Sequence, residues 1–138
     1  MSDKTSIACI ARDGSKVLIA HRQNVGQMAN RWEFPGGKIE PGETDEQAII
    51  REFYEEFGVQ VKVGRNIAAT QFEHNGKICA LHAYEIFVPH NGLEKPYVLT
   101  EHTEYKWVEL SEIENLNFVD SDLKLYPAVK EFFAMAGC

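Results

Sequence analysis

Three glutamates in the stretch REFYEEFG, residues 51–58, have the spacing that brings side chains together on a helix. Positions i, i+3 and i+4 lie on one helix face, so Glu52, Glu55 and Glu56 would converge there. Carboxylates about 5.5 Å apart repel each other by roughly 3 kcal/mol at an effective dielectric of about 20, and by much less when fully solvated. The crowding therefore predicts either a solvated surface or a bound cation that offsets the repulsion.

A glycine pair precedes this face in the sequence. Gly36 and Gly37 permit backbone conformations that are closed to other residues and let carbonyl groups approach a ligand closely. Magnesium takes oxygen ligands, keeps several waters and is typically shared with phosphate oxygens. Two or three carboxylates and a backbone carbonyl therefore indicate a site for one or more magnesium ions.

The same glutamates belong to a longer pattern. The segment GKIEPGETDEQAIIREFYEEFGV matches the Nudix box, GX5EX7REUXEEXGU, at every fixed position, namely Gly37, Glu43, Arg51, Glu52, Phe53, Glu55, Glu56, Gly58 and Val59. The wider segment MANRWEFPGGKIEPGET resembles the MutT branch of the Nudix hydrolase family. The later segment KICALHAY also resembles the CTP pyrophosphohydrolase relatives in that family, so the base of the substrate stays open.

This resemblance implies a fold and an activity. The fold would be α+β, an α/β/α sandwich around a mixed β-sheet, and a single domain would span residues 1–138. The activity would be hydrolysis of a nucleoside triphosphate to the monophosphate and pyrophosphate, with Mg²⁺ as cofactor and Mn²⁺ as a substitute. The expected role is nucleotide-pool sanitisation, a form of DNA repair, with 8-oxo-dGTP placed ahead of CTP.

The resemblance also implies the metal ligands and the general base. The Gly36 carbonyl and the side chains of Glu52, Glu55 and Glu56 would hold the metal ions. Glu101, in a loop six residues before Trp107, is the candidate for an additional ligand or the general base, and Glu52 is its rival for the base. Arg51 and Glu43 would orient the helix and loop around those ligands, a support that metal sites generally require.

Substrate-binding residues follow from the same comparison, each with a plainer alternative. Arg22 and Lys38 would contact phosphate, although both are common surface residues. Phe34 and Phe72 are the aromatic candidates for stacking on the base, against a default place in the core. Asp122 would read the base edge, or else would only cap the last helix.

Local signals predict the elements that must position these residues. Asp13-Gly14 and Asn75-Gly76 are hairpin signals between alternating runs. A helix is expected to begin at a cap formed by Thr44 or Asp45, to bury Ile49, Phe53 and Phe57, and to end at Gly58. The segment WEFPGGKIEPGE is expected to be irregular apart from a short strand over residues 32–34. The segment VQVKV is expected to form a strand of its own, and Phe87 is expected to lie in the core. A terminal helix is expected to begin near Tyr126 or to be kinked at Pro127.

Composition narrows the class of protein. The chain has 138 residues, a formal net charge of -7 and a pI near 5.2, which argues against nonspecific binding to nucleic acid or anionic membranes. Its three cysteines lack zinc-ligand spacing and are odd in number, which favours a reducing cytoplasm over a disulfide framework. No stretch is long and apolar enough to predict a membrane span or signal peptide. The protein is expected to act as a monomer or homodimer.

Two other functions fit parts of the sequence. A Nudix hydrolase for another diphosphate, such as ADP-ribose or a dinucleotide, would carry a Pro or Tyr marker beyond the box, and HNGK occupies that region here. A silent nucleotide-sensing module would tend to lose box glutamates, and all of them are present. Both alternatives are therefore expected less than a triphosphate pyrophosphohydrolase.

Overall fold

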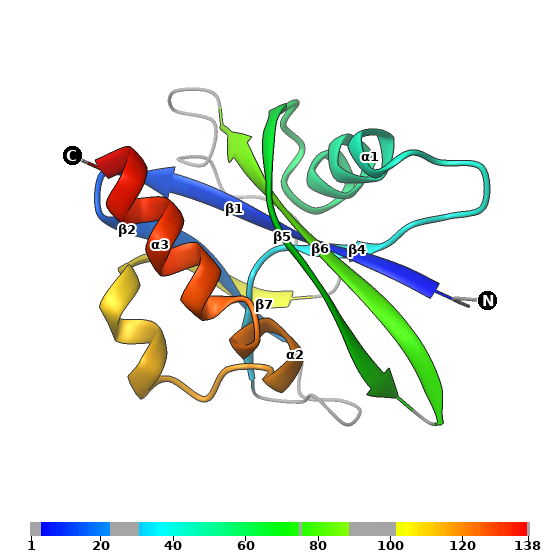
Figure 1. Ribbon diagram of the computed structural model, residues 1–138. Helices are drawn as coiled ribbons and strands as arrows, with labels where there is room; N and C mark the ends of the chain where they lie inside the picture. The colour runs from blue at the N-terminus through cyan, green and yellow to red at the C-terminus, as the bar shows by residue number, and fades with distance from the viewer. Residues whose placement is uncertain (1–3, 23–30, 75, 89–101, 138) are drawn as a thin grey trace.

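The structure, a computed structural model, describes residues 4–22, 31–74, 76–88 and 102–137. Its strands are β1 (Lys4–Asp13), β2 (Lys16–Arg22), β3 (Trp32–Glu33), β4 (Gly36–Lys38), β5 (Lys62–His74), β6 (Lys77–Phe87) and β7 (His102–Glu109). Its helices are α1 (Asp45–Phe57), the 3-10 helix η1 (Leu110–Asn115), α2 (Asp120–Leu123) and α3 (Tyr126–Gly137). Figure 1 shows these elements in chain order by colour.

The strands form one mixed sheet around β1. The hydrogen-bonded order is β3-β2-β1-β6-β5, while β4 pairs with β1 and β7 pairs with β2. The β1–β6 pair is parallel and the remaining pairs are antiparallel. Because β1 is shared by β2, β4 and β6, it connects the two halves of the sheet, and the predicted mixed sheet is confirmed.

Both predicted hairpins are present. Asp13 pairs with Lys16 across a turn in which Gly14 has a φ of 64°. His74 pairs with Lys77 across a turn in which Gly76 has a φ of 78°. Left-handed φ values favour glycine because it has no Cβ, so each glycine is required by the turn it makes.

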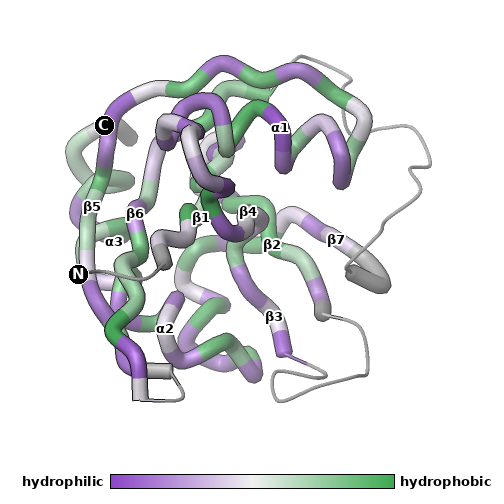
Figure 2. Tube along the Cα trace, turned by 90° about the vertical axis from the view of Figure 1, so that its right-hand side faces the viewer, coloured by the Kyte–Doolittle hydropathy of each residue, from purple (hydrophilic) through white to green (hydrophobic). Residues whose placement is uncertain are grey.

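Helices cover both faces of the sheet and create two hydrophobic cores, as the predicted α/β/α sandwich requires. One core gathers α1 residues with β1 and β6, and includes Ile7, Cys9, Ile49, Phe53, Phe57 and Ile86. The other lies under η1, α2 and α3, and includes Ile10, Leu81, Phe118, Leu125, Val129 and Phe133. Figure 2 shows the hydrophobic colour of the central strands and the alternation of polar and apolar residues along α1.

Three local predictions were wrong and one was confirmed. Gly36–Lys38 forms strand β4 instead of an irregular loop, because β1 supplies its hydrogen-bonding partners. VQVKV is not a separate strand, because β5 runs from Lys62 to His74 through two register shifts. Phe87, near the end of β6, is 52% exposed and therefore lies outside the core. Helix α3 begins at Tyr126, as predicted, with Pro127 in the first turn, where its missing N–H is tolerated.

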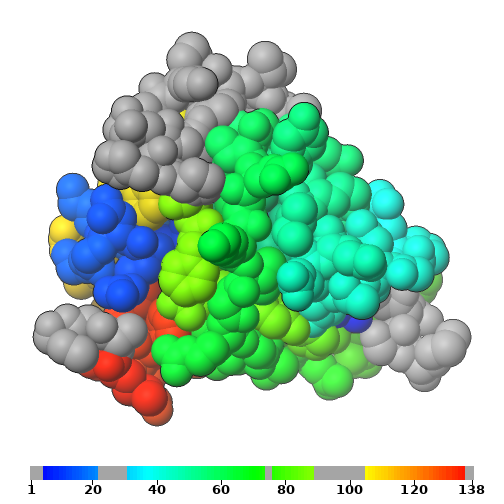
Figure 3. All heavy atoms as spheres, turned by 90° about the horizontal axis from the view of Figure 1, so that it is seen from above, coloured from blue at the N-terminus to red at the C-terminus, as the bar shows by residue number. Residues whose placement is uncertain are grey.

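The arrangement leaves α1 on one side of the molecule and the β1–β2 hairpin on the other. Figure 3 shows this from above, with the segment before α1 and α1 itself on one side of β5 and β6, and the hairpin in blue across from them. Among the described helices, none is long and apolar enough to cross a membrane.

Candidate active site

Helix α1 is bounded by two caps that fix where its glutamates lie. Thr44 accepts a hydrogen bond from the Gln47 backbone, the Gln47 side chain accepts one from the Thr44 backbone, and Gly58 ends the helix with φ 71°. The predicted helix, its Thr44 cap and its Gly58 end are therefore confirmed. Such a capping box satisfies two backbone donors that the helix itself cannot pair.

Arg51 forms hydrogen bonds to several acidic side chains on and near this helix. Its Nε donates to Oε2 of Glu43 at 2.6 Å and its Nη2 donates to Oε1 of Glu43 at 2.9 Å. Its Nη1 donates to Oε1 of Glu52 at 2.9 Å and to Oε1 of Glu55 at 3.1 Å. Nη2 also reaches the Lys38 carbonyl at 3.1 Å. One guanidinium thus ties the loop before α1 and strand β4 to two of the predicted metal ligands.

These bonds change the proton affinity of both partners. Hydrogen bonds from Arg51, followed by one from the Glu40 N–H at 2.9 Å, lower the pKa of Glu43 to about 2. The bond to Glu43 also raises the pKa of Arg51. Both groups therefore remain charged in the pH range where enzymes work, which keeps the loop and the helix in register.

Glu52 and Gly37 are in close contact. A Cβ built on Gly37 would stand 2.5 Å from Cδ of Glu52 and 2.6 Å from its Oε2, so the Glu52 carboxylate occupies the space that any larger residue would fill. Gly36, with φ 154°, is restricted as well, because a Cβ there would overlap the Ile7 carbonyl. The glycine pair is therefore required by close approach, to a carboxylate at one position and to β1 at the other.

The second half of the site lies at α2. Oδ2 of Asp122 accepts a hydrogen bond from the Phe34 backbone N–H at 2.9 Å, and Asp122 is 6% exposed. Trp32 holds the chain before α2 in place, because its N–H donates to the Asn117 carbonyl at 2.8 Å and its carbonyl accepts from the Val119 N–H at 2.9 Å. Asp122 is the third residue of α2 and lies four residues before the last helix, α3, begins at Tyr126, so the prediction that it caps the last helix was wrong.

A four-residue segment, Phe34–Gly37, links the two halves. Its first residue bonds Asp122 and its last residue lies against Glu52. Pro35 between them accepts a hydrogen bond from the Cys9 N–H at 2.7 Å, which fixes the segment on β1. Burial raises the pKa of Cys9, and the negative charges of Glu52 and Asp122 raise it further, as expected for a thiol near both carboxylates.

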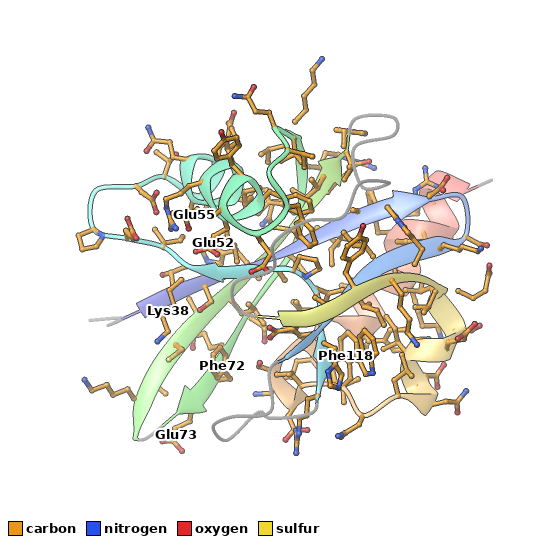
Figure 4. The ribbon with its side chains drawn as sticks, turned by 180° about the vertical axis from the view of Figure 1, so that it is seen from behind. Lys38, Glu52, Glu55, Phe72, Glu73 and Phe118 are labelled. Carbon is orange, nitrogen blue, oxygen red and sulfur yellow. The ribbon has the colours of Figure 1, made fainter. Side chains whose placement is uncertain are left out.

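The other predicted residues lie around this segment. Figure 4 shows Glu52 and Glu55 beside α1, Lys38 below them on β4, and Phe72 and Phe118 farther down. Lys38 is exposed, and Phe72 packs with part of its side chain in the core under α2. The Phe34 ring is 2% exposed and meets Phe118 edge-on with 5.1 Å between ring centroids.

Two predicted residues cannot be placed by their side chains. Glu101 lies outside the described residues, and Arg22 ends β2 with a side chain that is not described.

Glu56 is 7% exposed, whereas the side chain of Glu55 is 58% exposed, so the glutamates of the acidic face differ greatly in burial.

Sequence reasoning missed one group of contacts beside α1. Oδ2 of Asp45 lies 2.8 Å from Nδ1 of His82 and accepts a hydrogen bond from the Tyr84 hydroxyl at 2.6 Å. Asp45 and His82 are 37 residues apart in the chain. No local pattern in the sequence signals such a pairing.

Comparison with known proteins decides the family. The profile described as NUDIX domain matches residues 2–129, which is nearly the whole chain. The chain belongs to the Nudix family. Relatives of this chain are named for pyrophosphohydrolase and diphosphatase activities on nucleotides.

Three relatives show how far the similarity extends. CTP pyrophosphohydrolase of Escherichia coli (strain K12) is 37% identical over 121 residues, covering 88% of this chain and 86% of its own. The 8-oxo-dGTP diphosphatase of the same organism is 46% identical, but over 54 residues, which are 39% of this chain and 42% of its own. The solution structure of the E. coli ORF135 protein superposes with a TM-score of 0.82 at 30% identity, covering 99% of this chain and 94% of that one.

Nudix hydrolases generally use divalent metal ions, commonly Mg²⁺, and the residues present fit such an ion. The donors on α1 are carboxylate oxygens, the ligands that magnesium prefers, and the Glu52 carboxylate fills the space beside Gly37 that a Cβ would otherwise take. Within the described part of the chain, the structure gathers no three Asp, Glu, His or Cys side chains into a metal-holding group. Arg51 bridges Glu52 and Glu55 instead.

Proposed function

We propose that this Nudix protein hydrolyses nucleoside triphosphates to the monophosphate and pyrophosphate, with Mg²⁺ as cofactor. One observation carries the proposal: the segment Phe34–Gly37 joins an acidic helix face at Glu52 to a buried carboxylate at Asp122. Three residue steps span at most about 11 Å, since an extended chain advances about 3.3–3.6 Å per residue. That separation suits a ligand with phosphates at one end and a base at the other.

The residues of α1 and β4 have distinct parts in this reaction. Glu52, Glu55, Glu56 and the Gly36 carbonyl would hold the metal, which when bound supplies charge neutralisation for phosphate oxygens and a lower pKa for an attacking water. Glu101 would accept the proton of that water, with Glu52 as the rival base. Arg51 orients Glu52 and Glu55 through its two Nη1 hydrogen bonds. Lys38 and Arg22 would contact the phosphates.

Base recognition would fall to Asp122 and its surroundings. An ionised carboxylate only accepts hydrogen bonds, so it suits the exocyclic amine of cytosine, or N1–H and the amine of guanine. Thymine and uracil offer an imide N–H between two carbonyls, which would face the carboxylate unfavourably. The Phe72 side chain, partly buried against the core that contains Phe34, would provide apolar contact with the base. Phe34 would support that contact from within the core.

The similarity to known enzymes bears on the order of substrates. A relative named CTP pyrophosphohydrolase matches 88% of the chain at 37% identity, whereas relatives named 8-oxo-dGTP diphosphatase match 39% of the chain at 46% identity and 84% at 30% identity. We therefore place cytosine triphosphates first and 8-oxo-dGTP second, the reverse of the order expected from the box region. Either activity would serve nucleotide-pool sanitisation in the cytoplasm, and a net charge of -7 fits a protein that binds single nucleotides, not nucleic acid.

A substrate panel tests the proposal. Purified protein with Mg²⁺ would be incubated with CTP, dCTP, 5-methyl-dCTP, dGTP, 8-oxo-dGTP, UTP, dTTP and ADP-ribose, and the nucleotide products separated by chromatography. Monophosphate with an equal amount of pyrophosphate, formed fastest from cytosine or guanine-type triphosphates, supports the proposal. ADP-ribose as the best substrate would support the other Nudix activity, and no turnover of any compound would support a nucleotide-sensing module.

A further inference from the structure

Asp45, the first residue of α1, is bonded to strand β6 by two side chains. Its Oδ2 lies 2.8 Å from Nδ1 of His82 and 2.6 Å from the Tyr84 hydroxyl. The side chains of Asp45 and His82 are 26% and 30% exposed, so the contact is half-buried. Because a carboxylate accepts hydrogen bonds, both His82 and Tyr84 act as donors to it. We refer to these three residues as the Asp45 anchor.

The helix does not need this carboxylate for its own cap. Thr44 and Gln47 already form a reciprocal capping box at the same end. An acidic residue in the first turn interacts favourably with the helix dipole from a solvent-facing position as well. The Asp45 carboxylate is bound to the sheet instead, so its contacts bear on where the helix lies, in addition to whether it forms.

The sheet register relates the anchor to Glu52. Ile7 on β1 is paired with Gly37 on β4 and with His82 on β6, so Gly37 and His82 lie two strands apart in one row. Two strand spacings are about 9.5 Å. Asp45 and Glu52 are seven residues apart, which is about 10.5 Å along a helix and returns to the same helix face.

The two distances agree to about 1 Å. Helix α1 therefore crosses the strands with its first residue bonded at His82 and its eighth residue against Gly37. Helix α1 packs against β1, β4 and β5, and Figure 1 shows it next to these strands. With its first turn held, α1 has little freedom to slide or rotate, and such movement would carry Glu52 away from Gly37.

We propose that the Asp45 anchor positions Glu52 for the reaction, so that His82 and Tyr84 act on catalysis through Asp45 without touching the substrate. This inference rests on the proposed function, because it assigns residues that position the carboxylate used there. Burial and the bond to Asp45 raise the pKa of Tyr84 to about 12, so the hydroxyl keeps its proton and donates to Asp45 throughout the working range of pH.

Three variants and a matched control test the inference. Tyr84→Phe and Asp45→Ala each remove the hydrogen bond between the Tyr84 hydroxyl and the Asp45 carboxylate. The double variant loses the same single bond, so it shows whether the two effects add. Tyr126→Phe is the control: its hydroxyl donates to Oε2 of Glu114 at 2.9 Å and its pKa is also raised to about 12, but it lies on α3 across the sheet. A displacement of about 1 Å in a reacting group can cost on the order of 100-fold in rate.

The expected result is a division between kinetic parameters. Tyr84→Phe should lower kcat at least tenfold with KM changed less than twofold, and adding it to Asp45→Ala should lower kcat no further, because residues in one bonded unit are not additive. The Gly37 amide resonance should move in Tyr84→Phe and stay in place in Tyr126→Phe. Tyr126→Phe should keep kcat near the wild-type value.

Other outcomes overturn the inference. A folded Tyr84→Phe protein with wild-type kcat, or one whose melting temperature falls while kcat and the Gly37 resonance do not change, would show that the anchor only stabilises the fold. Loss of kcat in the Tyr126→Phe control to the same degree would also contradict it. These results differ from a failure of the proposed function, in which the wild-type protein itself would hydrolyse none of the triphosphates.

Discussion

The Glu52 carboxylate lies against Gly37, in the space that a side chain at position 37 would occupy. A Cβ there would stand 2.5 Å from Cδ of Glu52, closer than real atoms approach. Gly37→Ala should therefore displace Glu52 and lower kcat on the order of 100-fold, since small displacements of a reacting group have such effects. Steady-state kinetics on the best triphosphate would measure the loss.

Gly14→Ala is the control for this substitution. Gly14 has φ 64° with no atom within 4 Å of a built Cβ, so alanine there is strained without a collision. It should lower stability by about 1–2 kcal/mol and leave kcat unchanged. Equal kcat in Gly37→Ala and the wild type would mean that the Glu52 position does not matter to turnover.

The Glu43–Arg51 pair predicts a pH dependence of stability. The pKa of Glu43 falls from an ordinary 4.5 to about 2 in the folded protein, chiefly through hydrogen bonds from Arg51. A lowered folded-state pKa gives stability that is fully present above pH 4.5 and is lost as the pH falls toward 2. Urea unfolding between pH 2 and 5 should show a steeper loss for the wild type than for Glu43→Gln. Parallel curves would contradict this assignment.

Metal binding should be linked to folding. Since Mg²⁺ would bind only the native arrangement of the α1 carboxylates, the melting temperature should rise with the Mg²⁺ concentration. At one hundred times the Kd, the free energy of unfolding should be higher by about 2.7 kcal/mol. The rise should be smaller in Glu56→Gln, which removes one negative charge from the face. Thermal unfolding with Mg²⁺, with Mn²⁺ and with a chelator measures it, and curves that ignore both metals over millimolar concentrations would exclude the site.

Local signals in the sequence predicted what local contacts determine. Thr44 and Gly58 mark the two ends of α1 through hydrogen bonds to residues three or four positions away. Gly14 and Gly76 adopt the positive φ values that their hairpin turns need. The Nudix box therefore predicted correctly the helix that carries the glutamates, and likewise the family.

Contacts between distant residues could not be predicted in this way. Gly36–Lys38 becomes a strand because β1 lies beside it, and Asp45 meets His82 across 37 residues. Asp122 bonds Phe34 across 88 residues, which no cap pattern near residue 122 reveals. Arg51 was expected to orient the helix and loop around the metal ligands, but its simultaneous bonds to Glu43, Glu52 and Glu55 depend on the folded positions of that loop and helix.

Asp122 should control the ranking of bases. Asp122→Ala removes the buried acceptor, so the preference for cytosine and guanine-type triphosphates over UTP and dTTP should weaken by about 1–3 kcal/mol in kcat/KM. Turnover of the poorest substrates should stay nearly the same. Competition assays with paired triphosphates would measure the ratio, and an unchanged ranking would mean that the base is read elsewhere.

The most direct test of the central claim is pyrophosphate release from CTP and 8-oxo-dGTP by wild-type protein and by Glu55→Gln, each with and without Mg²⁺. The Glu55 side chain is 58% exposed and bonds Arg51 at one atom, so the variant should keep the fold, as circular dichroism would verify. We expect wild-type release to require Mg²⁺ and Glu55→Gln to lower it by several powers of ten, because one ligand charge is lost from the transition state. Release by a folded Glu55→Gln protein at the wild-type rate would contradict it.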